Sequence, residues 1–164
     1  INAGVVMEDE PFVVDAANSI DDLRSWMAAN SGKCNSRFLV VADRDENFAG
    51  YLPVETLYSG SEKADSPVGV ALYDKAPFVT EDVPVNRVCE IMGDAGLDCI
   101  AVVSKPGNKV TGIINAADII KTYSHLHLQD NAYQTSISIP RRTLKLIVRG
   151  RTLVQFIRDK TENN

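Results

Sequence analysis

Residues 112–124 read GIINAADIIKTYS, and residues 50–59, which read GYLPVETLYS, follow nearly the same outline. In each segment a glycine and apolar residues lead into a polar position and then into an apolar helical pattern. The segments differ where the helix is expected to begin: the later one has Asp118, and the earlier one has Thr56 at the matching place. An ending that is written twice indicates an internal duplication.

The duplication extends over most of the first 125 residues. Residues 11–27 (PFVVDAANSIDDLRSWM) align with residues 77–92 (PFVTEDVPVNRVCEIM) if one inserted residue is allowed. Residues 37–52 (RFLVVADRDENFAGYL) align with residues 99–114 (CIAVVSKPGNKVTGII). The period of roughly 65 residues is longer than that of solenoid repeats. It therefore indicates two copies of a small domain.

Each copy is predicted to contain a strand, a helix, two strands joined as a hairpin, and a closing helix. In the second copy Val85, Val88, Cys89 and Met92 recur at helical spacing, and Gly96 follows as a stop signal. The turn sequences RDEN and KPGN separate two apolar runs in the first and second copy. One copy alone has little core, so we expect the two copies to pack against each other.

We divide the chain into residues 1–66, the first copy with an N-terminal lead-in, residues 67–125, the second copy, and residues 126–164, a C-terminal extension. The extension is basic although the chain carries a net charge of −5. Its basic residues are Arg141, Arg142, Lys145, Arg149, Arg151, Arg158 and Lys160. One interpretation is an amphipathic segment that packs on the pair or on a sister subunit. The other is a basic face directed towards anionic lipid headgroups.

Composition narrows the class of protein. A chain of 164 residues with 45% hydrophobic residues can bury a sizeable core. A net charge of −5 and a pI of about 5.0 argue against a nucleic-acid partner. Cys34, Cys89 and Cys99 form no CxxC pair, which favours a reduced, cytosolic setting. There is no apolar run of the ~20 residues that span a bilayer and no signal peptide, and the start at Ile1 favours a fragment of a longer protein.

No arrangement of residues indicates catalysis. His125 and His127 would share a face on a strand, as a metal-binding pair does, but no nearby cysteine or carboxylate completes a ligand set. Both histidines lie in one segment, so no Ser–His–Asp or Cys–His arrangement is indicated. A phosphate-binding glycine loop is absent. We therefore expect a protein that is not an enzyme and has no metal site.

The order of elements, the duplication and the two endings resemble a tandem pair of CBS domains, the Bateman module, over residues 11–124. This resemblance implies an α+β fold in which two CBS repeats, each strand–helix–strand–strand–helix, pack with pseudo-two-fold symmetry, here followed by the basic extension. It also implies a regulatory role, no required cofactor, an adenine nucleotide (ATP, ADP or AMP) as candidate ligand, and assembly into a homodimer.

Asn115 and Asp118 are the leading candidates for ligand binding. Their spacing of three places both side chains on one face at the start of the closing helix. One interpretation is structural: Asn115 is an N-cap, and Asp118 completes a motif like a capping box. The other is that the carboxylate also accepts both hydroxyls of a ribose. Thr56 cannot accept a diol in this way, so at most one of the two clefts is equipped for a nucleotide.

The family resemblance adds the rest of the site. In CBS pairs that bind adenosine nucleotides, a Ser or Thr and an Asp hold the ribose, and here Asn115 replaces the hydroxyl. The resemblance places Val14, Asn35 and Ser36 on the opposite wall. These residues face Ile113, Ala117 and Asp118. Neither Asn35 nor Ser36 offers the aromatic ring on which some relatives stack adenine.

Two short segments suggest a host protein. The opening INAGVV resembles the junction after the last membrane helix of bacterial CLC chloride channels and transporters. Residues 137–153 resemble basic segments near the ends of such proteins. The leading interpretation is a regulatory domain on the cytoplasmic side of the membrane, joined to a membrane transport domain of the same polypeptide. The alternative is a stand-alone or enzyme-linked CBS module that acts as an energy sensor or a dimerisation element.

Overall fold

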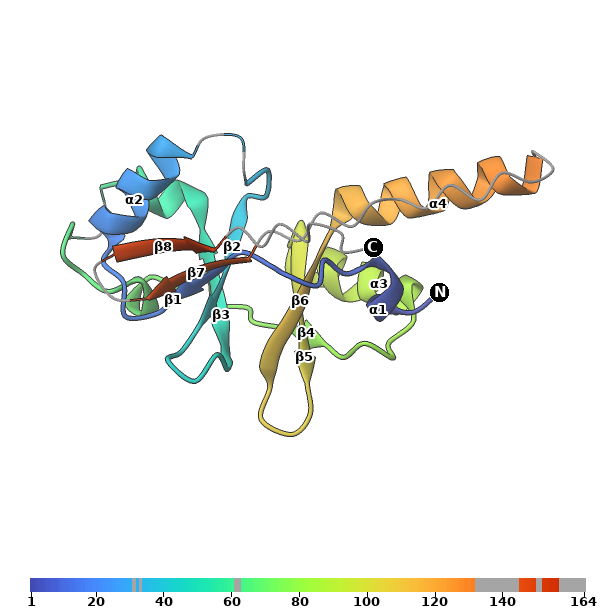
Figure 1. Ribbon diagram of the computed structural model, residues 1–164, viewed down its shortest axis with the longest axis horizontal. Helices are drawn as coiled ribbons and strands as arrows, with labels where there is room; N and C mark the ends of the chain where they lie inside the picture. Colours follow the sequence, from blue (N-terminus) through green and yellow to red (C-terminus); the bar gives the residue numbers. More distant parts are fainter. Residues whose placement is uncertain (31, 33, 61–62, 132–144, 150–151, 157–164) are drawn as a thin grey trace, which may run out of the picture.

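The computed structural model describes residues 1–30, 32, 34–60, 63–131, 145–149 and 152–156. The two copies form two adjoining lobes, each with its own sheet, and α4 projects from the second lobe (Figure 1). The predicted α+β fold with two sheet-containing copies is therefore confirmed.

The first copy contains β1 (Val13–Asp15), α2 (Ile20–Ala29), β2 (Phe38–Ala42), β3 (Phe48–Pro53) and the 3-10 helix η1 (Val54–Leu57). Strand β1 runs parallel to β2, and β2 runs antiparallel to β3. Helix α2 begins after Ser19, whose hydroxyl caps it by accepting a hydrogen bond from the Asp22 N–H at 3.1 Å. The copy thus has the predicted order, and its closing helix is a single 3-10 turn.

The second copy contains the 3-10 helix η2 (Val68–Val70), β4 (Phe78–Val79), α3 (Val85–Ala95), β5 (Cys99–Ser104), β6 (Lys109–Asn115) and α4 (Ala116–Asn131). Its sheet repeats the pairing of the first, since β4 is parallel to β5 and β5 is antiparallel to β6. Gly96 ends α3 in the left-handed conformation with φ 68°. The predicted stripe on α3 is buried except at Cys89, which is exposed because the buried face continues to Ala95 instead.

In the described part of the chain, three hydrophobic clusters form the core. One lies within each copy, and the third lies between them. The cluster between the copies consists of Phe38, Val40, Tyr51, Ala95, Leu97, Cys99, Ala101 and Ile113. Residues of β2 and β3 therefore pack on residues of β5 and β6. The predicted packing of the two copies against each other is confirmed.

Short segments exchange between the copies. Helix α1 (Ala3–Val6), grouped with the first copy in the sequence, packs in the core of the second, where Ala3 belongs to the same buried cluster as Val88. The Ala3 N–H donates to the Val83 carbonyl at 2.8 Å. Conversely, Val68 packs in the core of the first copy. Periodicity could not show this, since a segment of three or four residues carries no signal for its packing partner.

The C-terminal extension adds to the first sheet. Helix α4 runs to Asn131, so the predicted boundary between residues 125 and 126 falls inside it. Strands β7 (Lys145–Arg149) and β8 (Thr152–Phe156) form an antiparallel hairpin, and β7 runs parallel to β1. The sheet order is β3-β2-β1-β7-β8, which supports the interpretation that the extension packs on the pair.

The basic face predicted for the extension stays a prediction. Five of its seven basic residues lie outside the described residues: Arg141, Arg142, Arg151, Arg158 and Lys160. Among the helices that the structure describes, none is both long and apolar enough to cross a bilayer.

Candidate functional site

A cavity of about 380 Å³ lies between the two copies, at the start of α4. One wall comes from the lead-in and the first copy, including Glu8, Phe12 and Ser36. The other wall comes from the second copy, including Asp98 and Asp118. The volume falls within the ~300–1,000 Å³ range of small-molecule sites.

Asp118 stands on the second-copy wall and is oriented by Asn115. Strand β6 ends at Asn115 and α4 begins at the next residue. The Asn115 amide donates to Asp118 Oδ2 at 3.2 Å, and Lys121 Nζ lies 3.6 Å from Asp118 Oδ1. The prediction that Asn115 and Asp118 share one face is therefore confirmed. Within the described residues, the Asn115 side chain makes this bond and no capping bond to a helix N–H, so it positions the carboxylate.

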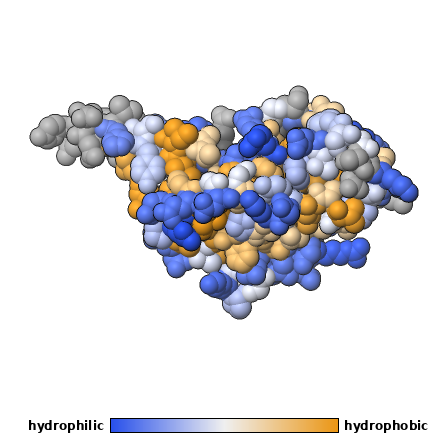
Figure 2. Space-filling view, turned by 180° about the vertical axis from the view of Figure 1, so that it is seen from behind, coloured by the Kyte–Doolittle hydropathy of each residue, from blue (hydrophilic) through white to orange (hydrophobic). Residues whose placement is uncertain are grey.

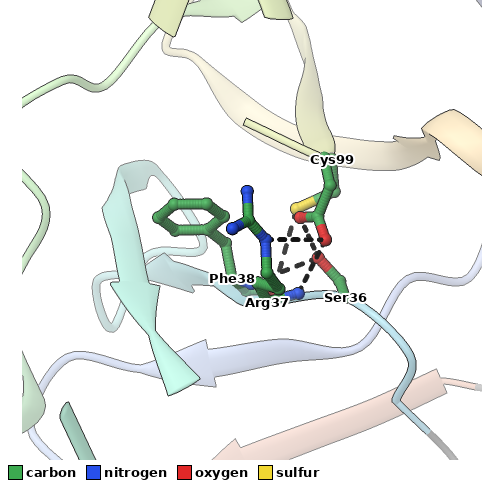
Figure 3. Close-up of polar contacts among 5 residues, drawn as sticks. Ser36, Arg37, Phe38 and Cys99 are labelled. Atoms are coloured by element: carbon green, nitrogen blue, oxygen red, sulfur yellow. Dashed lines mark hydrogen bonds and ion pairs between the residues drawn. The ribbon is translucent and has the colours of Figure 1, made fainter. Parts of the chain in front are cut away.

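Asp98 fixes the opposite wall across the boundary between the copies. Its Oδ1 accepts the Ser36 hydroxyl at 2.6 Å, and its Oδ2 accepts the Arg37 N–H at 2.8 Å. The Ser36 oxygen accepts the Phe38 N–H at 3.2 Å in turn. Figure 3 shows Ser36, Arg37 and Phe38 gathered opposite Cys99, whose thiol donates to the Phe38 carbonyl at 3.7 Å. The chain entering β2 is thus tied to the chain entering β5.

Asp98 was not predicted as a site residue, because the periodicity of apolar residues does not reveal its contact with Ser36. The alignment of the two copies does contain a signal for this contact. In the alignment of the copies Arg37 matches Cys99, so Ser36 and Asp98 occupy matching positions. Matching positions that lie close to a pseudo-two-fold axis meet each other. The Ser36 hydroxyl already donates to Asp98 and is therefore not free to donate to a ligand. Ser36 instead helps to fix the position of the cavity wall.

Aromatic side chains line the cavity, although Asn35 and Ser36 supply none. Phe12 and Phe38 both contribute to its wall. The Phe12 ring stacks on Trp26 with centroids 4.7 Å apart and planes at 13°. Phe12 directly precedes β1, which begins at Val13, and its ring lines the cavity.

Val14 is the one predicted site residue that the structure places elsewhere. Its side chain is 0% exposed in the core of the first copy and does not line the cavity. Alternation along β1 explains the correction, because Val13 packs towards the cluster between the copies and Val14 points to the opposite face. The remaining predicted residues do line the cavity: Asn35, Ser36, Ile113, Asn115, Ala117 and Asp118.

Burial changes the titration of three groups in the wall. Burial, and to a smaller extent the Asp118 carboxylate, raises the pKa of Glu8. Burial also raises the pKa of the Cys34 thiol, and it raises the pKa of the Cys99 thiol to about 12. Both thiols are therefore neutral near pH 7. The charge of the cavity is set by its carboxylates and Lys121.

Other candidate residues lie apart from the cavity. Thr56 sits in η1, where its carbonyl accepts the Ser59 hydroxyl at 3.3 Å, and it is not part of the wall. His125 and His127 lie on α4, where a spacing of two places side chains on different sides of the helix. No group of three or more His, Cys, Asp or Glu side chains in the described part of the chain is arranged to hold a metal ion.

Comparison with known proteins supports this fold. Residues 70–125 match the family model of the CBS domain. The cytosolic domain of the Mg²⁺ channel MgtE, solved in complex with ATP, is 19% identical with a TM-score of 0.64; the alignment covers 74% of this chain and 48% of that one. The chain thus spans about half the length of that domain. A search of the curated proteins found no match.

Two further solved structures match over nearly their whole length. The CBS domain pair of protein MJ0100, in complex with 5′-methylthioadenosine and S-adenosyl-L-methionine, is 16% identical with a TM-score of 0.63, over 77% of this chain and 98% of that one. A CBS domain pair/ACT domain protein from Thermotoga maritima is 16% identical with a TM-score of 0.62. The alignment covers 77% of this chain and 98% of that one. The chain therefore has the fold of a CBS domain pair. None of these three similar structures is a CLC protein.

Proposed function

We propose that the chain is a regulatory CBS-pair module that binds an adenine-containing ligand in the cavity between its two copies. The observation that carries the proposal is the Asp118 carboxylate, held by the Asn115 amide in a wall of a cavity that both copies build. A carboxylate can accept both hydroxyls of a ribose, and Phe12 offers an apolar ring for a base. The adenine-containing ligands of the MgtE domain and of the MJ0100 pair support this ligand class.

The proposed mode of action is conformational and not catalytic. A ligand that touches both walls favours the arrangement of the copies in which both walls can reach it. It shifts an equilibrium only by its difference in affinity between two states, and typical couplings are ~1–3 kcal/mol. The module would therefore change the activity of an attached protein several-fold, and it would not switch that activity completely.

The attached protein is a narrower hypothesis. The matches favour a broad class of CBS sensor modules that includes cytosolic domains of ion transporters. The CLC-like segments at the two ends favour a chloride channel or transporter within that class, with this module on the cytoplasmic side. The full open reading frame tests the narrower hypothesis: a CLC host requires ten or more apolar helices of ~20 residues ahead of Ile1.

Isothermal titration calorimetry with adenosine, AMP and ATP tests the proposed site. We expect Asp118→Ala to weaken the tightest of these ligands at least about tenfold, because a charge-assisted hydrogen bond is worth roughly 1.5–3 kcal/mol. Thr56→Ala is the matched control, since Thr56 takes the equivalent place in the other copy, and it should change the affinity little. Equal weakening by the two substitutions, or no binding to the unmodified chain, would contradict the proposal.

A further inference from the structure

The cavity is lined by more negative than positive charge. Among the described residues in its wall, the carboxylates are Glu8, Asp98 and Asp118, and the one basic side chain is Lys121. Lys121 is 71% exposed and already paired with Asp118 at 3.6 Å, so its charge is largely screened by water. Asp98 is occupied by Ser36 and by the Arg37 N–H. Asp118 has only the long Asn115 bond and an ion pair to the exposed Lys121, so Glu8 and Asp118 are the carboxylates best able to meet a ligand.

The backbone of Glu8 is held in place, although none of the described residues donates to its carboxylate. Its N–H donates to the Ile113 carbonyl at 2.8 Å, and its carbonyl accepts the Ile113 N–H at 3.2 Å. These bonds attach the lead-in to β6 two residues before Asn115. No described residue donates a hydrogen bond to the Glu8 carboxylate. Burial and the nearby Asp118 raise the pKa of Glu8, which agrees with two carboxylates that face one cavity.

This arrangement suits some adenosyl ligands better than others. If Asp118 holds the ribose hydroxyls, the Glu8 carboxylate is left to face the rest of the ligand, and it repels any negatively charged group there. A nucleotide phosphate carries one to two negative charges and brings them near Glu8, whereas no glycine-rich phosphate loop or second basic side chain is present in the described wall to offset them. A neutral 5′ substituent avoids this repulsion, and a sulfonium group is attracted.

We infer that the cavity selects phosphate-free adenosyl compounds, such as a nucleoside, a thioether or a sulfonium, over adenine nucleotides, and that Glu8 is the residue that discriminates. This inference rests on the proposed function and specifies its ligand class. Neither carboxylate is consumed or transformed in this role, because the selection is made by charge alone.

Calorimetry of the full chain with adenosine, 5′-methylthioadenosine, S-adenosyl-L-methionine, AMP and ATP at one ionic strength tests the inference. We expect the three phosphate-free compounds to bind at least ~10-fold tighter than AMP, because like charges brought together in a buried site are strongly unfavourable. Glu8→Gln keeps the shape and removes the charge. It should reduce the preference for adenosine over AMP about tenfold and weaken the sulfonium compound. Glu55→Gln, at an exposed position, is the matched control for net charge and should change neither ratio.

The outcomes separate this inference from the proposed function. AMP or ATP binding as tightly as adenosine, with loss on Asp118→Ala, would overturn the inference and leave the proposed function standing. A preference for adenosine that Glu8→Gln does not reduce would overturn the role of Glu8. Binding of none of the five compounds would overturn both.

Discussion

Tyr51 joins the two copies through its hydroxyl. The side chain is 0% exposed, donates to the Pro77 carbonyl at 2.6 Å and accepts the Ala101 N–H at 2.9 Å. Burial raises the pKa of Tyr51 above its ordinary value, so the hydroxyl remains a donor throughout the neutral range. One side chain of β3 thus satisfies polar groups next to β4 and in β5.

Removing this hydroxyl should destabilise the chain. We expect Tyr51→Phe to lower the free energy of unfolding by about 1–3 kcal/mol, because the buried Ala101 N–H loses its partner. Urea denaturation followed by circular dichroism measures the change. Tyr58→Phe removes a hydroxyl from a residue that is 61% exposed and should stay within ~0.5 kcal/mol. Equal losses for the two variants would show that the Tyr51 bonds contribute nothing specific.

At the scale of residues, the sequence predicted those parts of the site whose relative positions are determined within one helical turn. Asn115 and Asp118 were found because their spacing alone determines that they share a face. Glu8, Phe12 and Asp98 were missed because each comes from a different part of the chain. Their proximity depends on how the lead-in and the two copies pack, which no local pattern records.

At the scale of elements, Gly112 sets how closely the lead-in approaches β6. A Cβ at this position would lie 2.7 Å from Met7 Sδ and 2.9 Å from the Glu8 carbonyl oxygen. The sequence has a glycine at the matching place in both endings, and a strand was predicted around each of them. It did not predict that the N-terminal segment would pair there, since residues 1–8 show no alternation of apolar and polar residues.

Gly112→Ala should push the lead-in away from β6. We expect a loss of about 1–3 kcal/mol in the free energy of unfolding, the usual cost of overpacking, and weaker ligand binding because Glu8 moves. Gly93→Ala, in α3, has nothing within 4 Å of the added Cβ and should be neutral or stabilising by up to ~1 kcal/mol. Chemical denaturation of both variants compares them. A neutral Gly112→Ala would mean that the lead-in adjusts without cost.

At the scale of the whole molecule, hydrophobic side chains remain exposed where α4 leaves the second lobe (Figure 2). Ile120, Tyr123 and Leu126 are exposed on α4 at 66%, 40% and 38%. Helix α1 contacts α4 and adds Val5, which is 63% exposed.

The duplication and the packing of the copies were predicted because both follow from repeated patterns. The length of α4 was not, since the predicted closing helix ended near residue 125.

We expect this α1–α4 surface to bind the same surface of a second copy. In an isologous homodimer the same apolar surface of each subunit covers that of the other, and no such surface remains exposed. The family resemblance implies the same kind of association. Ile120→Asp places a charge in the middle of this surface and should raise the dimer dissociation constant at least ~10-fold, because burying an unpaired carboxylate is costly. Val70→Asp is the matched control, since Val70 is 63% exposed in η2, a segment that packs on the first copy and not on α1 or α4. Light scattering across micromolar concentrations measures both, and an unmodified chain that stays monomeric at tens of micromolar would contradict the prediction.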